Sequence, residues 1–149
     1  MKNKKNIIII IVLCLAVGAI FLFRFIKAEE KNYEVNSTEI TSINVYDSCN
    51  QVSVIPSNDD KIHVTYYDKS SNKYTISVED SVLIISNKSG NSGNGVNAGI
   101  SFSNTSLTIE VPVSFTGEFT AKTFDKCNID DSLNFSNVDA ESLSDIFGS

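Results

Sequence analysis

Histidine and cysteine, the side chains used most often for acid–base and soft-metal chemistry near neutral pH, are scarce in this 149-residue chain, which has one histidine and three cysteines. The single histidine, His63, alternates with Lys61 and Thr65 on one face of a predicted strand. Catalytic and metal-binding imidazoles need partner groups, and this imidazole is the only one in the chain. We therefore expect His63 to be a surface or packing residue, and we expect no catalytic residue, no metal site, no cofactor and no enzymatic activity.

Motifs for calcium and nucleotide binding are also missing. The acidic pairs at 59–60, 79–80 and 130–131 stand in apparent turns, where Asp is favoured by turn geometry alone, and no D-x-D-x-D-G spacing occurs. The glycine-rich segment 87–101 lacks the order G-x-x-x-x-G-K-[ST] of a phosphate-binding loop. It is either a hairpin connection or a recognition loop that hydrogen-bonds a glycan or a peptide. The residues of such a recognition loop are Gly90, Asn91, Gly93, Asn94, Gly95, Asn97 and Gly99.

The chain does have one long apolar run, close to its start. Residues 7–26 contain a single charge, Arg24, and follow lysines at positions 2, 4 and 5. As a helix with a rise of about 1.5 Å per residue, this segment measures about 30 Å, the thickness of a bilayer core. The sequence therefore predicts a transmembrane helix over residues 7–26 that anchors the chain in the lipid bilayer.

A cleavable signal peptide is the alternative interpretation of this segment. The apolar part of such a peptide is usually about 7–15 residues long and ends at a small-x-small cleavage site. Here the run is longer, and the nearest candidate site, Ile26-Lys27-Ala28, has isoleucine where a small residue belongs. These features favour the uncleaved anchor.

Charge predicts the orientation of the chain. Residues 1–27 carry five basic residues and no acidic one, whereas residues 28–149 carry seven lysines against eighteen acidic residues, a formal charge of −11. Lys/Arg bias keeps a short basic end in the cytoplasm, so the acidic part is expected to be extracytoplasmic in a single-pass membrane protein. The same negative charge argues against nucleic acid as a partner.

Four segments follow from these patterns. Residues 1–6 form a cytoplasmic basic tail, residues 7–26 the transmembrane anchor, residues 27–39 a polar stalk and residues 40–149 one β-domain. About 120 residues outside the anchor suffice for one modest hydrophobic core.

Alternation of apolar and polar residues predicts an all-β fold after the stalk, because a period of two is typical of half-buried strands. No segment after residue 28 keeps a helical apolar period over three turns. In the last third, short apolar stretches recur with small polar residues between them, which suits coils of a parallel β-solenoid. The predicted strands are centred on residues 43–45, 52–54, 62–66, 74–78, 82–85 and 107–111.

Six of these stretches also carry a resemblance to a known family; they are residues 43–45, 52–57, 60–66, 74–76, 83–85 and 107–112. Through these stretches, the segment from about residue 40 to residue 149 resembles the bacterial putative adhesin domain, a domain of unknown function in envelope proteins of Gram-positive bacteria. The resemblance implies a small β-domain that leads into a short or truncated parallel β-solenoid, without catalytic residues. Asp125 to Ile129 stands at the first solenoid position but lacks the glycine of the family motif.

Two cysteines lie in the part predicted to be exported, where disulfides can form. A Cys49–Cys127 bond would close a long loop, but the two residues stand in different parts of the apparent fold. The sequence leaves both a disulfide and two free thiols open.

Three functions are compatible with these features. The first is an adhesin-like module that binds a cell-wall polymer or an envelope peptide or protein. The second is an accessory protein of a cell-envelope stress response. The third is a shortened remnant without a binding role of its own.

Overall fold

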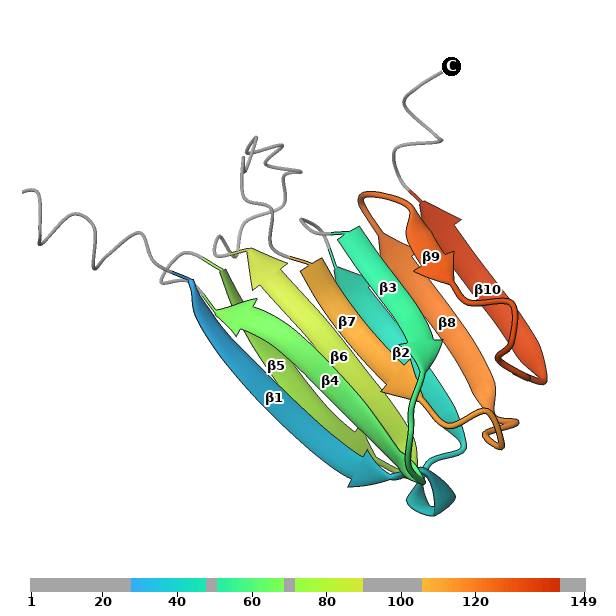
Figure 1. Ribbon diagram of the computed structural model, residues 1–149. Helices are drawn as coiled ribbons and strands as arrows, with labels where there is room; N and C mark the ends of the chain where they lie inside the picture. The colour runs from blue at the N-terminus through green and yellow to red at the C-terminus, as the bar shows by residue number, and fades with distance from the viewer. Residues whose placement is uncertain (1–27, 48–50, 69–71, 90–105, 143–149) are drawn as a thin grey trace, which may run out of the picture.

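The computed structural model describes residues 28–47, 51–68, 72–89 and 106–142, and this part of the chain is nearly all β (Figure 1). The predicted all-β class is therefore confirmed. The predicted anchor, residues 7–26, lies outside the described residues, so the anchor and the membrane localisation stay predictions. Among the residues that are described, no helix has the length and apolar character to cross a membrane.

The described strands form two five-stranded sheets stacked face to face (Figure 1). Sheet A has the order β1 (Glu29–Asn36), β4 (Lys61–Asp68), β7 (Ser106–Val111), β3 (Gln51–Pro56) and β9 (Cys127–Ile129). Sheet B has the order β10 (Asn137–Ser142), β8 (Glu118–Thr123), β2 (Ser42–Asp47), β6 (Val82–Ser89) and β5 (Asn72–Glu79). A short 3-10 turn, η1 (Ser37–Glu39), connects β1 to β2.

Both sheets are mixed, with antiparallel strands at one end and parallel strands at the other. In sheet A, β4 is antiparallel to β1 and β7, whereas β3 is parallel to β7 and β9. In sheet B, β5 is antiparallel to β6, and the pairs β6–β2, β2–β8 and β8–β10 are parallel. The chain passes from sheet B to sheet A both between β2 and β3 and between β8 and β9.

One continuous core lies between the sheets, because alternate residues of each strand point inward. Phe119 of β8, Ile43 of β2 and Leu83 of β6 are register partners in this layer. Full burial of each such side chain stabilises the fold by about 1.5–3 kcal/mol. The completely buried apolar side chains are Ile43, Val45, Val52, Val54, Ile62, Val64, Leu83, Ile85, Leu107, Ile109, Val111, Phe119 and Ala121.

The structure places a strand where the sequence predicted a polar stalk over residues 27–39. β1 pairs with β4 along its full length, from Glu29 opposite Asp68 to Asn36 opposite Lys61. The half-buried side chains of Tyr33 and Val35 pack against the core. The period-two pattern is present in β1, but its few apolar residues stand among charged ones, and this low contrast concealed the strand.

Candidate functional site: the outer face of sheet A

The outer face of sheet A is formed by the residues that alternate with the buried ones. In β4, Ile62 and Val64 are buried, so Lys61, His63 and Thr65 point away from the core. The same alternation applies to the other strands of the sheet. Strand pairing then aligns these outward side chains into two neighbouring rows that run across the strands.

The first row is uncharged and spans the whole sheet; we call it the neutral row. It consists of Asn32, Thr65, Thr108, Ser53 and Asn128, which are register partners on β1, β4, β7, β3 and β9. The Thr65 hydroxyl donates a hydrogen bond of 2.8 Å to Asn32 Oδ1. Neighbouring strands lie about 4.8 Å apart, so the row offers hydroxyl and amide groups at this interval.

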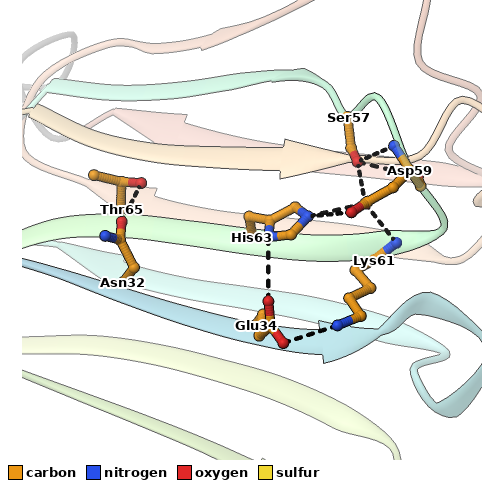
Figure 2. Close-up of polar contacts among 7 residues, drawn as sticks. All are labelled: Asn32, Glu34, Ser57, Asp59, Lys61, His63 and Thr65. Atoms are coloured by element: carbon orange, nitrogen blue, oxygen red, sulfur yellow. Dashed lines mark hydrogen bonds and ion pairs between the residues drawn. The ribbon is translucent and has the colours of Figure 1, made fainter.

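A charged cluster lies beside the neutral row, centred on His63 (Figure 2). His63 Nε2 lies 2.9 and 3.0 Å from the two carboxylate oxygens of Asp59, and Nδ1 lies 3.9 Å from Glu34 Oε2. Lys61 Nζ donates to Glu34 Oε1 at 2.8 Å. On the other neighbouring strand of β4, β7, Glu110 is the register partner of His63. The charged cluster thus joins β1, β4, β7 and the turn between β3 and β4.

Local backbone geometry fixes the position of Asp59. Its Oδ1 accepts hydrogen bonds from the Lys61 backbone N–H at 2.9 Å and from the Ser57 hydroxyl at 2.9 Å. The hydrogen bond from the Lys61 backbone N–H has the largest effect on the pKa of Asp59, and those from His63 and Ser57 come next. Together they lower this pKa from 3.8 to about 2. Asp59 therefore carries its negative charge throughout the physiological pH range.

Glu34 and Lys61 stabilise each other's charges. The hydrogen bond and the positive charge of Lys61 lower the pKa of Glu34, and Glu34 raises the pKa of Lys61 in the same way. Within the charged cluster, the carboxylates of Glu34, Asp59 and Glu110 outnumber the single lysine. The cluster therefore carries an excess of negative charge.

A shallow hollow adjoins the charged cluster at the end of β1. It measures about 250 Å³ and is lined by Glu34, Val35, Asn36, Glu39 and Lys61. Enclosed sites for small molecules usually measure about 300–1,000 Å³. The hollow is thus better suited to one group of a larger ligand that lies on the face of the sheet.

The charged cluster is not arranged for nucleophilic catalysis. A catalytic triad needs the base to contact the nucleophile, whereas the Ser57 hydroxyl donates to Asp59 and not to His63. Within the residues that the structure describes, no group of three or more His, Cys, Asp or Glu side chains could hold a metal ion. The geometry is that of fixed polar groups on a surface, which suits binding.

His63 lies on the surface of sheet A, but with partners that the sequence did not reveal. Asp59 is four residues away along the chain and reaches His63 because the turn folds back over β4. Glu34 comes from β1, the strand that was predicted as a stalk. The weak alternation of apolar and polar residues in β1 is the one sequence signal that points to this partner.

The other predicted site residues are distributed elsewhere. Cys127 of β9 is a free, half-buried thiol that packs against the core, and burial raises its pKa to about 11. Its proposed partner Cys49 lies outside the described residues. The residues of the predicted recognition loop, Gly90, Asn91, Gly93, Asn94, Gly95, Asn97 and Gly99, also lie outside them, and their role stays a prediction.

Known proteins resemble this chain in structure. No family model matches it, and no curated protein does so either. A crystal structure of a putative adhesin from Bacteroides fragilis is 14% identical, with a TM-score of 0.50 over 76% of this chain and 50% of that chain. A putative cell adhesion protein from Clostridium sporogenes is 13% identical, with a TM-score of 0.44 over 73% of this chain and 57% of that one. At 14% identity the likeness to the Bacteroides fragilis structure is one of fold alone. This chain spans about half the length of the two structures.

Proposed function

We propose that this chain is an adhesin-like binding module at the bacterial cell envelope. Residues 7–26 hold it in the membrane, and the β-domain presents the outer face of sheet A outside the cell. The observation that carries this proposal is the alignment of fixed polar side chains across that face, above a fully buried core. A rigid scaffold of this kind keeps a binding surface pre-organised, which lowers the entropy lost on binding.

Two likenesses support the adhesin-like class. The sequence resembles the bacterial putative adhesin domain, and the fold is shared with the Bacteroides fragilis structure, which is described as a putative adhesin. This chain spans only half of that structure. The ligand of this chain is therefore inferred from its own surface.

We also propose that the parallel strands are coils of a short β-solenoid. Each of the segments β2–β3 and β8–β9 contributes one strand to sheet B and the next to sheet A. The two segments are stacked in parallel, with β2 next to β8 and β3 next to β9. Stacked coils would explain the repetition of short apolar stretches in the last third of the sequence.

Binding of the full-length protein to insoluble cell-wall material tests the proposed function. The protein, kept in detergent micelles, is mixed with wall fragments and the bound fraction is measured. Thr108→Lys changes the centre of the neutral row, and Thr120→Lys makes the same change on the outer side of β8 in sheet B. We expect Thr108→Lys to weaken binding about tenfold or more, as loss of a central contact does, and Thr120→Lys to have no effect. Absence of wall binding by the unaltered protein, or equal losses in both variants, would contradict the proposal.

Membrane topology needs its own experiment. Protease added to intact, wall-stripped cells should digest the β-domain and leave a small membrane-bound stub, because the domain is proposed to lie outside. Full protection of the domain would place it on the cytoplasmic side. Mature protein that begins near Glu29 would replace the anchor with a cleaved signal peptide.

A further inference from the structure

We propose that the outer face of sheet A binds an amine-bearing glycan, that is, a polysaccharide with free amino groups on its sugars. This inference rests on the proposed function and specifies its ligand. It combines the charge of the cluster around His63 with the geometry of the neutral row.

Charge complementarity selects a cationic ligand. The carboxylates of Glu34, Asp59 and Glu110 come from β1, the β3–β4 turn and β7, and Lys61 is the one lysine in the cluster. The exported part of the chain has a formal charge of −11, so its long-range field also attracts cations. An anionic polymer would be repelled by the same groups.

The neutral row selects a hydroxyl-rich chain that crosses the strands. Its five side chains extend over about 19 Å, four intervals of about 4.8 Å each, and they present hydroxyl and amide groups without charge. A sugar in an extended glycan has about the length of one such interval, so consecutive sugars can meet consecutive strands. Amino groups on one edge of this glycan would then face Glu34, His63 and Glu110 of the charged cluster.

A basic peptide fits this face less well. Extended peptides usually bind to sheets through backbone hydrogen bonds at an exposed edge strand. On the outer face of sheet A, β4, β7 and β3 are paired on both sides, so their backbone groups are already used within the sheet. Only side chains are available to the ligand there, and the hydroxyl groups of a glycan are suitable partners for them.

The imidazole of His63 lies at the centre of this charge arrangement. The charged groups around it are Glu34 on β1, Glu110 on β7, Asp59 in the β3–β4 turn and Lys61 on β4. The three carboxylates exceed Lys61 in charge and can interact with the amines of the ligand. A permanent cation at this position would compete with those amines for the same carboxylates.

Two matched oligosaccharides test the proposal on the full-length protein in detergent micelles. One is the hexamer of glucosamine, and the other is the hexamer of N-acetylglucosamine, which has the same backbone but no amine. Binding is measured at neutral pH, where part of the glucosamine amines is protonated. We expect the glucosamine hexamer to bind about tenfold more tightly, and added salt to reduce this difference because exposed charges are screened. Equal affinity for the two hexamers, or tighter binding of the acetylated one, would overturn the proposal.

Variants identify the surface that is used. Glu110→Gln should weaken binding of the glucosamine hexamer by up to about fivefold, the effect of one exposed ion pair, while Glu118→Gln on sheet B serves as a control of equal charge change. His63→Arg should weaken binding and His63→Gln should retain it. Matching thermal unfolding curves show that the variants are folded. Losses of the same size in Glu110→Gln and Glu118→Gln would overturn the assignment to sheet A.

The remaining outcomes separate this inference from the proposed function. If hexalysine binds as tightly as the glucosamine hexamer and depends on the same residues, the partner is a basic peptide and the glycan proposal is wrong. If the protein binds wall material but shows no preference for amines, the glycan proposal fails while the binding function holds. If the protein does not bind wall material at all, both fail.

Discussion

Asp59 has the most strongly defined environment in the charged cluster. Three hydrogen bonds, from the Lys61 backbone, the Ser57 hydroxyl and the His63 ring, favour its ionised form and lower its pKa to about 2. In the unfolded chain the ordinary value of 3.8 applies. A carboxyl whose pKa is lower in the folded state stabilises the fold above its unfolded pKa, and this contribution is lost as the pH falls through the folded pKa.

Asp59→Asn should therefore destabilise the protein at neutral pH, because the amide accepts these hydrogen bonds more weakly. The difference in free energy of unfolding between the two proteins should be constant above about pH 4 and should shrink as the pH falls from 3.8 toward 2. Denaturant unfolding as a function of pH measures it, with the neighbouring Asp60→Asn as the control for net charge. A difference that stays constant down to pH 2 would contradict the role given to Asp59.

Cys127 provides a second residue-scale prediction. Burial raises the pKa of its thiol to about 11, so little thiolate exists at neutral pH, and the thiolate is the reactive form. Alkylation of Cys127 by iodoacetamide should be slow in the native protein and fast in denaturant, and peptide mapping by mass spectrometry separates it from the other two cysteines. Equal rates in the native and denatured protein would show that the β9 edge of the core is open to solvent.

At the scale of elements, the tight connection between β5 and β6 has an unusual composition. Asp80 and Ser81 have φ angles of 50° and 64°, the left-handed conformation of a two-residue hairpin turn that usually selects Asn-Gly or Asp-Gly. Serine has a Cβ atom and pays a conformational cost there.

Ser81→Gly should stabilise the protein by about 0.5–1 kcal/mol. Glycine relieves the strain of the left-handed conformation, and this gain is partly offset by its greater conformational entropy in the unfolded chain. The Ser81 carbonyl, which accepts hydrogen bonds from the N–H and hydroxyl of Thr41, is retained in this variant. Thermal unfolding measures the effect, and Ser57→Gly in the β3–β4 turn is a contrast that should destabilise because it removes the hydroxyl bound to Asp59. A lower melting temperature for Ser81→Gly would contradict this account.

The elements that could be predicted from the sequence are those with strong contrast between their two faces. β4, with Ile62 and Val64 alternating with polar residues, was evident, whereas β1 was not, because its inward positions include Lys31. Lys31 is tolerated there because it forms a 2.9 Å ion pair with Asp68 at the margin of the sheet. Such pairing between strands far apart in sequence cannot be read from local composition.

The candidate site escaped prediction for the same reason. His63, Lys61 and Thr65 were placed on one strand face from the sequence, but their partners Glu34, Asn32 and Glu110 come from other strands. Only the register of sheet A brings these groups together.

At the scale of the whole molecule, the two outer faces differ in chemistry although the sheets share one core. Sheet A presents the neutral row and the charged cluster, whereas sheet B presents the exposed Tyr46, flanked in register by Lys122 and Ser86. Aromatic side chains on both faces report on contact with a ligand. Tyr67 lies on the outer face of sheet A, where its hydroxyl donates a 2.8 Å hydrogen bond to Glu30.

Hydroxyl-radical footprinting of the full-length protein, with and without cell-wall material, tests most directly whether the outer face of sheet A is the binding surface. Radicals oxidise exposed His and Tyr side chains, so a bound ligand protects the residues that it covers. We expect lower oxidation of His63 and Tyr67 in the bound protein, while Tyr46, 43% exposed on sheet B, keeps its oxidation rate. Protection of Tyr46 with unchanged oxidation of His63 and Tyr67 would contradict it.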